Sequence, residues 1–276
     1  MKLFKRQINQ KSKRKKTLEE ILDLFEKGGE IVERETFLQT LEDVKRILSK
    51  GGYVASIPSI TYLRNNMSLD SFVWAQDLDG ASIEYFGKDV NGLIEKRGEK
   101  YVIITHNLRL PTIKSLVNYK WGTNRVEKGI KYPQEILDNL LKGKTPQNEN
   151  IDLYHIEDFL KIKERQNKRF GVIVPYSMIE KKGFIIGQKK YISSPFIRAR
   201  KGVNEVELNL YSEKLMERLK DNVKLSKNRF VLLCNHNYLE DYLPSVQAQI
   251  LYTSSLGIST GQNIGSNPHR FLVVKS

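Results

Sequence analysis

The chain lacks the sequence features that several protein classes require. Its single cysteine, Cys234, cannot form a disulfide within the chain, and no Cys/His spacing assembles a zinc site. No apolar run reaches the roughly 18 residues that a membrane-spanning helix needs. Neither a complete Gly-x-x-x-x-Gly-Lys-Ser/Thr phosphate loop nor a Gly-x-Gly-x-x-Gly dinucleotide motif occurs. These absences exclude a disulfide scaffold and a helical membrane protein, and they leave no motif that names a reaction.

Positive charge is plentiful, and it is concentrated at the N-terminus. The formal net charge is +14, and subtracting the eight Lys and Arg of residues 1–16, which contain no acid, leaves +6 for the rest of the chain. Such a segment buries little apolar surface, and its cations can neutralise phosphates. We therefore predict a disordered basic arm at 1–16 that binds nucleic acid, DNA or RNA, with a solubilising tail or contact with an anionic membrane as alternatives. The arm residues that we expect to bind are Lys11, Lys13, Arg14, Lys15 and Lys16.

The first residues also bear on localisation. No apolar core of a secretory signal follows Met1, and one lone cysteine is typical of a reducing compartment. We expect a cytoplasmic protein without a membrane partner.

Apolar spacing and turn residues predict alternating helices and strands. Helices are expected at 17–25, 36–50, 89–97, 112–119, 133–141, 151–169 and 212–219. Strands are expected at 53–57, 71–75, 81–86, 101–105, 170–174, 183–186, 190–192, 203–211, 229–234 and 270–274. This order predicts an α/β or α+β fold with a helical segment at 17–50, a first α/β unit at 51–145 and a second at 151–276.

A weak self-similarity links the two units. Residues 83–85 resemble 206–208, and residues 101–107 resemble 230–237, with Leu-Pro following each of the latter pair. The two units would then be duplicates. The alternative is that unrelated strands share the same Pro and Asn endings, because these residues commonly end strands.

Two apolar strands end in the same dipeptide, His106-Asn107 and His236-Asn237. Ligands gather at the ends of strands in open sheets, and imidazole can donate, accept or ligate. We predict these residues as a phosphate or ligand site. Arg270, which follows a Gly- and Ser-rich stretch, is a further candidate for the same role. The alternatives are ordinary turn caps and a surface loop.

An acidic pair follows the apolar segment that begins at Phe72. The sequence Asp77-Leu-Asp79-Gly80 resembles the first motif of the haloacid dehalogenase phosphotransferases, in which an apolar strand precedes Asp-x-Asp-Gly. The resemblance implies that Asp77 is a nucleophile, that Asp79 is a general acid/base and that Mg²⁺ binds nearby. The chain lacks the later Lys and acidic motifs of that family. Without this resemblance we predict no cofactor, and Asp-x-Asp-Gly is also an ordinary turn signal.

Cations alternate with aromatic residues in the second half of the chain. Aromatic rings stack on bases, and Lys or Arg follows a phosphate backbone, so this composition indicates a nucleic-acid groove. Core packing of the aromatic residues is the alternative. The predicted contacts are Lys189, Lys190, Arg198, Arg200 and Lys201.

These patterns favour a non-catalytic nucleic-acid-binding protein, with DNA as one ligand, from a virus, phage, plasmid or other mobile element. One alternative is a metal-dependent phosphotransfer or nuclease enzyme that uses Asp77 and Asp79. Another alternative is a capsid-like assembly protein, for which the partner would be further copies of the chain.

Overall fold

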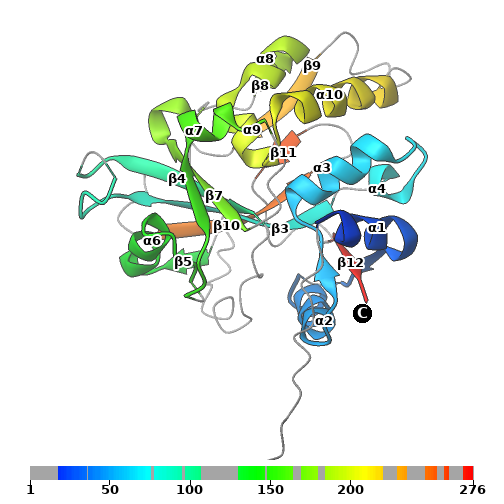
Figure 1. Cartoon of the computed structure of the whole chain (residues 1–276), viewed down its shortest axis with the longest axis horizontal. Helices are drawn as coiled ribbons and strands as arrows, with labels where there is room; N and C mark the ends of the chain where they lie inside the picture. Colours follow the sequence, from blue (N-terminus) through cyan, green and yellow to red (C-terminus); the bar gives the residue numbers. More distant parts are fainter. Residues whose placement is uncertain are drawn as a thin grey trace, which may run out of the picture.

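The computed structural model describes residues 18–35, 37–75, 78–94, 97–106, 130–146, 148–163, 169–179, 184–219, 229–234, 246–253, 258–260 and 270–275. Within these residues, helices pack on sheets whose strands are mostly antiparallel, with a few parallel pairs (Figure 1). The fold is therefore of the α+β class and begins with a short N-terminal helix, as the sequence predicts.

The main sheet of the described residues has nine strands. Its central order is β1 (Glu30–Glu33), β12 (Arg270–Val274), β3 (Leu78–Lys88), β4 (Lys100–His106), β7 (Phe170–Pro175) and β6 (Asp152–His155). β2 (Tyr53–Val54) pairs with β12, and β10 (Val246–Thr253) pairs with β3 and with β5 (Ile130–Tyr132). A separate sheet contains β11 (Ile258–Thr260), β9 (Arg229–Cys234) and β8 (Phe184–Gly187).

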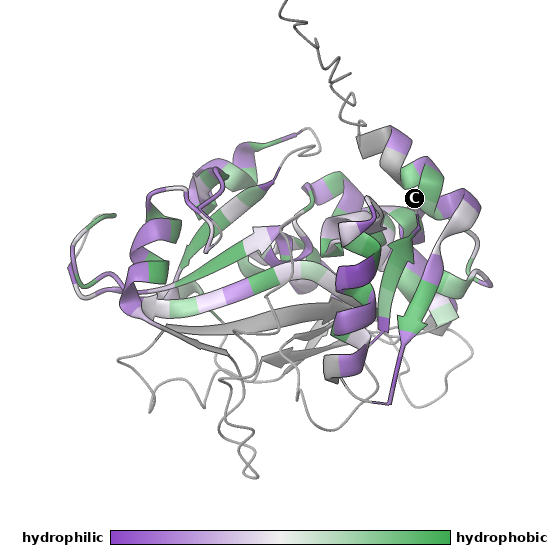
Figure 2. Ribbon diagram, turned by 90° about the horizontal axis from the view of Figure 1, so that it is seen from below, coloured by the Kyte–Doolittle hydropathy of each residue, from purple (hydrophilic) through white to green (hydrophobic). Residues whose placement is uncertain are grey.

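Helices cover both faces of the main sheet. The described helices are α1 (Leu18–Gly28), α2 (Phe37–Ser49), α3 (Ile57–Asn66), α4 (Phe72–Ala75), α6 (Gln134–Leu141), α7 (Ile156–Lys161), α8 (Gln188–Ser193), α9 (Pro195–Lys201) and α10 (Glu205–Leu219), with a 3₁₀ turn at Tyr176–Met178. Figure 2 shows hydrophobic residues along the strands next to the C-terminus, and helices that carry both hydrophobic and hydrophilic residues.

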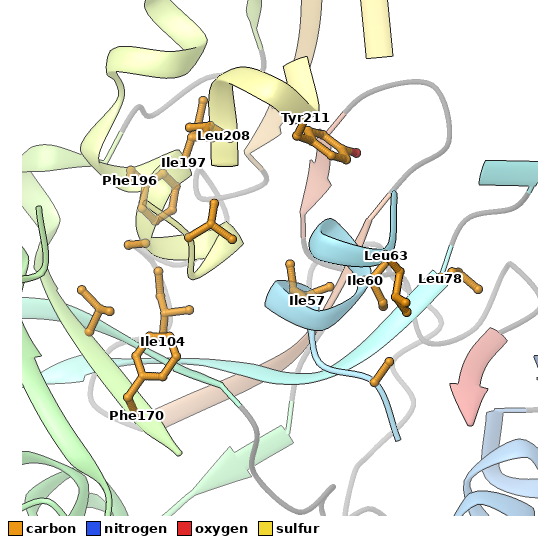
Figure 3. Packing of buried hydrophobic residues seen from close by; sticks show 14 of the residues in the cluster. Ile57, Ile60, Leu63, Leu78, Ile104, Phe170, Phe196, Ile197, Leu208 and Tyr211 are labelled. Atoms are coloured by element: carbon orange, nitrogen blue, oxygen red, sulfur yellow. The ribbon is translucent and has the colours of Figure 1, made fainter. Parts of the chain in front are cut away.

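Alternate residues of each central strand point to opposite faces, which builds two cores. In β12, Leu272 packs with α1 and α3, whereas Phe271 and Val273 pack with α2. In β4, Ile104 joins the first core and Ile103 joins the second. Figure 3 shows how Ile104 and other sheet residues meet side chains from α3, α9 and α10 in the first core. This layer of helices determines where the polar side chains described below are buried.

Several predicted elements are confirmed. The structure has helices at α1, α2 and α6 and strands at β3, β4, β7, β8, β9 and β12 where the sequence predicts them. These segments have either a long amphipathic period or a continuous apolar run, so their local pattern is unambiguous. The predicted helix at 112–119 lies outside the described residues.

Other predicted elements are wrong. Within the segments predicted as strands, residues 72–75, 190–192 and 205–211 are helical in α4, α8 and α10. Residues 89–94, which are predicted as helical, are not. The predicted strand at 53–57 is limited to β2. The range 151–169 is predicted as one helix, but in the structure it contains strand β6 followed by the short helix α7, which ends at Lys161. Short apolar segments are compatible with both structures, so packing decides between them.

Strands from both predicted α/β units belong to one sheet. β4, from 51–145, pairs along its length with β7, from 151–276, and β1, from the predicted helical segment, pairs with β12. The self-similar residues 83–85 and 206–208 lie in a strand and in a helix, respectively. The similarity of residues 83–85 to residues 206–208 therefore does not correspond to a shared secondary structure.

Candidate functional sites

The predicted cations of α9 face the interior of the protein. Ser194 caps this helix by accepting a hydrogen bond from the Ile197 amide, and Gly202 ends it with a left-handed backbone. Arg198, Arg200 and Lys201 are only 7%, 2% and 2% exposed. In this structure the protein therefore encloses the side chains of these three residues, which the sequence predicts as nucleic-acid contacts. Lys189 and Lys190, on α8, are exposed.

Arg200 forms a buried ion pair with Glu84 of β3. Its Nη2 donates to Glu84 Oε2 over 2.7 Å and its Nε donates to Oε1, so the contact is bidentate. The guanidinium also lies 4.1 Å from the centre of the Phe196 ring. Burial raises the pKa of Glu84, and the charge of Arg200 opposes that shift. The pair fixes α9 to the sheet, and nothing in the sequence pattern linked these two residues.

A second group of cations is enclosed by aromatic rings. Lys201 Nζ lies 4.2 Å from the centre of the Tyr211 ring, and Arg64 donates to the Tyr211 hydroxyl over 3.2 Å. Arg64 also lies 5.2 Å from the Trp74 ring and donates to the Val73 carbonyl. Burial lowers the pKa of Lys201. Cation–π contact and hydrogen bonding thus stabilise charges at the junction of α3, α9 and α10.

His106 also lies inside the protein rather than at a surface corner. Its Nε2 donates to the Ala199 carbonyl over 2.8 Å, which leaves Nδ1 to accept from the Ser82 hydroxyl at 2.9 Å. The Ser82 oxygen in turn accepts from the Ile57 amide. Burial lowers the pKa of His106 to about 4. His106, which the sequence predicts as a ligand-binding residue, therefore links β4, β3, α3 and α9 as a neutral side chain.

The other members of the predicted phosphate site are not brought together with His106. Asn107, His236 and Asn237 lie outside the described residues. Arg270 lies in β12 and makes a bidentate ion pair with Glu33 of β1, with distances of 2.7 and 3.0 Å. In the described structure Arg270 therefore joins two neighbouring strands.

The acidic pair does not follow an apolar strand. Residues 72–75 form helix α4, and Asp79 lies within strand β3, where its backbone is opposite Tyr252 of β10 and Phe271 of β12. Asp77 lies outside the described residues. The local structure therefore differs from the strand-then-Asp arrangement that the resemblance to the haloacid dehalogenases implies. Among the residues that the structure describes, no group of three or more His, Cys, Asp or Glu side chains is arranged to hold a metal ion.

The structure forms one groove that our sequence reasoning missed. It lies between strand β1 and helix α2, and Arg34, Asp43 and Arg46 contribute to its lining. The separation of Asp43 and Arg46 by three positions on one helix was the available signal, because such residues are neighbours on a helix surface. Arg34 precedes the helix, and only the folding of β1 beside α2 brings it to the same carboxylate.

Comparisons with known proteins concern the fold. No family model and no curated protein matches the chain. One similar solved structure is described as "Accommodation of massive sequence variation in Nanoarchaeota by the C-type lectin fold". The likeness has a TM-score of 0.57 at 14% identity and covers 88% of this chain and 96% of that chain. The α+β architecture is thus similar to a C-type lectin fold. Separately, no helix within the described ranges has the length and apolarity needed to cross a membrane.

Proposed function

We propose that this protein is a non-enzymatic binding protein that uses its basic N-terminal segment to hold nucleic acid. The observation that carries the proposal is the density of charge, since residues 1–16 contain eight cations and no acid. Each cation that meets a phosphate releases condensed counterions, so affinity for nucleic acid falls steeply as salt rises.

The burial pattern of the folded part supports this division of roles. Arg200 is neutralised by Glu84, and Lys201 and Arg64 contact aromatic rings inside the protein. These cations serve the core, so phosphate contacts fall to the N-terminal segment, together with exposed residues such as Lys189 and Lys190. The fold of the body is similar to one described as accommodating sequence variation, and we propose that the body contributes partner-specific contacts.

The experiment compares salt dependence in two variants of the full chain that each lose four positive charges. The first replaces four residues of the basic segment by Gln: Lys13, Arg14, Lys15 and Lys16. The matched control replaces four exposed lysines of the folded part by Gln: Lys27, Lys142, Lys161 and Lys163. Binding of labelled single- and double-stranded oligonucleotides is followed by fluorescence anisotropy between low and moderate salt.

On duplex DNA, each phosphate contact contributes about 0.9 to the magnitude of the slope of log K against log salt concentration. We therefore expect the first variant, which loses four cations, to reduce the magnitude of this slope by up to about 3.6. The control should keep nearly the wild-type slope, because its charges lie elsewhere. Equal slopes in the two variants would refute the role of the basic segment. Cleavage of the oligonucleotide with Mg²⁺ would favour the enzyme alternative instead, and large particles in light scattering would favour the assembly alternative.

A further inference from the structure

The groove between β1 and α2 lies along an outer edge of the main sheet. β1 stands at the end of the strand order, and among the described residues its neighbour in the sheet is β12. The groove has a volume of 580 Å³, and its lining includes every residue of β1 and the following Arg34. In Figure 1, α2 and β12 lie at the lower end of the molecule, apart from α8 and α9. An edge strand carries main-chain donors and acceptors that another strand can pair with.

The side chains of β1 divide between the two faces of the sheet. Val32 packs with the core that includes α2, whereas Ile31 packs with the core that includes α1. Because successive residues of a strand alternate, Glu30 and Arg34 lie on the same face as Val32. The ion pair of Arg34 with Asp43 of α2 agrees with this placement. In chain order, this face of the edge strand therefore presents an acid, an apolar residue and a cation.

Such a face is complementary to itself in an antiparallel pair of strands. If two copies place Val32 opposite Val32, Glu30 of each copy lies opposite Arg34 of the other copy. The contact then has an apolar pair at its centre and an ion pair on either side, and both kinds of pair stabilise a sheet. A register centred on Ile31 would place Glu30 opposite Val32 and would form neither contact.

The two charged residues remain accessible to a second copy. The side chains of Arg34 and Glu30 are 57% and 52% exposed, although within the chain they pair with Asp43 and Lys275. A guanidinium has five N–H donors and a carboxylate has about four lone-pair sites, so each group can make a further contact.

The charge of the groove favours a second copy over a highly charged partner. The lining contains four cations and three acids, which leaves a net charge of only +1. A nucleic acid would be repelled by the acids, and residues 1–16 of this chain, with eight cations and no acid, would be repelled by the cations. A second β1 carries the same mixture of charges, and antiparallel pairing brings unlike charges together.

We propose that two copies of the chain pair β1 with β1 about a two-fold axis, which joins their main sheets. The same residues of both copies form the contact, so the assembly closes at a dimer. This inference goes beyond the proposed function, because the contact requires no nucleic acid. The dimer would carry residues 1–16 twice on one particle.

The test reverses the charge at each paired position and follows the mass of the full chain by sedimentation over a range of protein concentrations. In Glu30→Lys, cations face each other at both ends of the contact, and in Arg34→Glu, acids do. Like charges opposed across a contact are strongly unfavourable, so we expect the dissociation constant of the dimer to rise at least about tenfold in either variant.

An equimolar mixture of the two variants should form dimers again. Each end of the mixed contact has one cation and one acid, as in the wild type. Variants that had merely lost their fold would not recover on mixing, so this measurement separates pairing from folding. The matched controls are Asp158→Lys and Lys161→Glu, which reverse the charges of another exposed ion pair, on α7, and should dimerise as the wild type does.

Hydrogen exchange of the wild-type protein provides a measurement without variants. The amides of β1 should become more protected as the protein concentration rises, whereas those of β6, at the opposite end of the strand order, should not. The proposal is overturned if the wild type remains a monomer, if it forms particles larger than a dimer, or if the mixture of Glu30→Lys and Arg34→Glu stays monomeric while the wild type dimerises.

Discussion

His106 couples the stability of the fold to pH. Its pKa in the folded protein is about 4, below the ordinary value of 6.5, because the buried ring is desolvated. The unfolded chain therefore takes up a proton as pH falls through 6.5, while the folded protein does so only near pH 4. The contribution of this residue to stability is present above pH 6.5 and declines between these two values, by about 3 kcal/mol in total.

We predict that His106→Gln weakens the fall in stability between pH 6.5 and pH 4. Gln does not titrate in this range, so only the other groups would contribute to the pH dependence of the variant. Urea unfolding of both proteins at several pH values gives the two slopes. The variant should be less stable than wild type at pH 7, because it loses a hydrogen bond between the sheet and α9, and the difference should narrow toward pH 4. If the free energy of unfolding depends on pH in the same way in both proteins, His106 is not a buried neutral side chain in the folded protein.

The end of α9 shows how an element depends on a neighbouring strand and helix. Gly202 has a φ of 63°, and a Cβ there would lie 2.5 Å from Pro58 Cγ and 2.9 Å from His106 Nε2. The glycine lets α9 end in close contact with α3 and β4. Both the backbone conformation and the available space therefore require a residue without a side chain.

We predict that Gly202→Ala destabilises the protein by more than the 1–2 kcal/mol that a left-handed backbone costs an ordinary residue, because the new methyl group also meets two buried side chains. Gly28→Ala is the control, since a Cβ at this position in α1 has no atom within 4 Å. We expect the control to change stability by no more than about 0.5 kcal/mol. Chemical denaturation measures both, and a similar loss in the two variants would contradict the close packing at Gly202.

Helix α10 explains why some elements were predicted wrongly. Val206, Leu208 and Leu210 alternate with polar residues, which is the period of a half-buried strand. In the structure the helix buries Leu208 and Tyr211 instead and leaves Val206 and Leu210 exposed at 78% and 41%. The alternation was a real feature of the sequence, but contact of α10 with α3 decided which residues became buried.

At the scale of the whole molecule, one sheet joins segments from both ends of the chain. β12 lies between β1 and β3, and β4 pairs with β7 across the predicted boundary at 145–151. A sheet that shares strands in this way cannot lose one half without exposing the hydrogen-bonding edge of the other. We therefore expect the described body to unfold in one cooperative step.

This expectation can be tested with Val172→Ala in β7, where Val172 is fully buried. The cavity should cost about 2 kcal/mol and should lower hydrogen-exchange protection by a similar amount in β3 and β4 as well as in β7. Val206→Ala, at an exposed position of α10, is the matched control and should leave protection nearly unchanged. Loss of protection confined to residues after 151 would show that the two predicted units are independent.

The sequence alone determined the charge distribution, the mixture of helices and strands, and the position of those elements whose apolar period was long or continuous. These properties depend on composition and on neighbouring residues, so they can be worked out locally. Only the tertiary structure decided that Arg200 belongs to Glu84, that His106 is buried beneath α9, and that Arg34 meets Asp43. Each of these pairs joins residues of different elements, and the strength of a charge or hydrogen bond depends on how completely packing removes it from water.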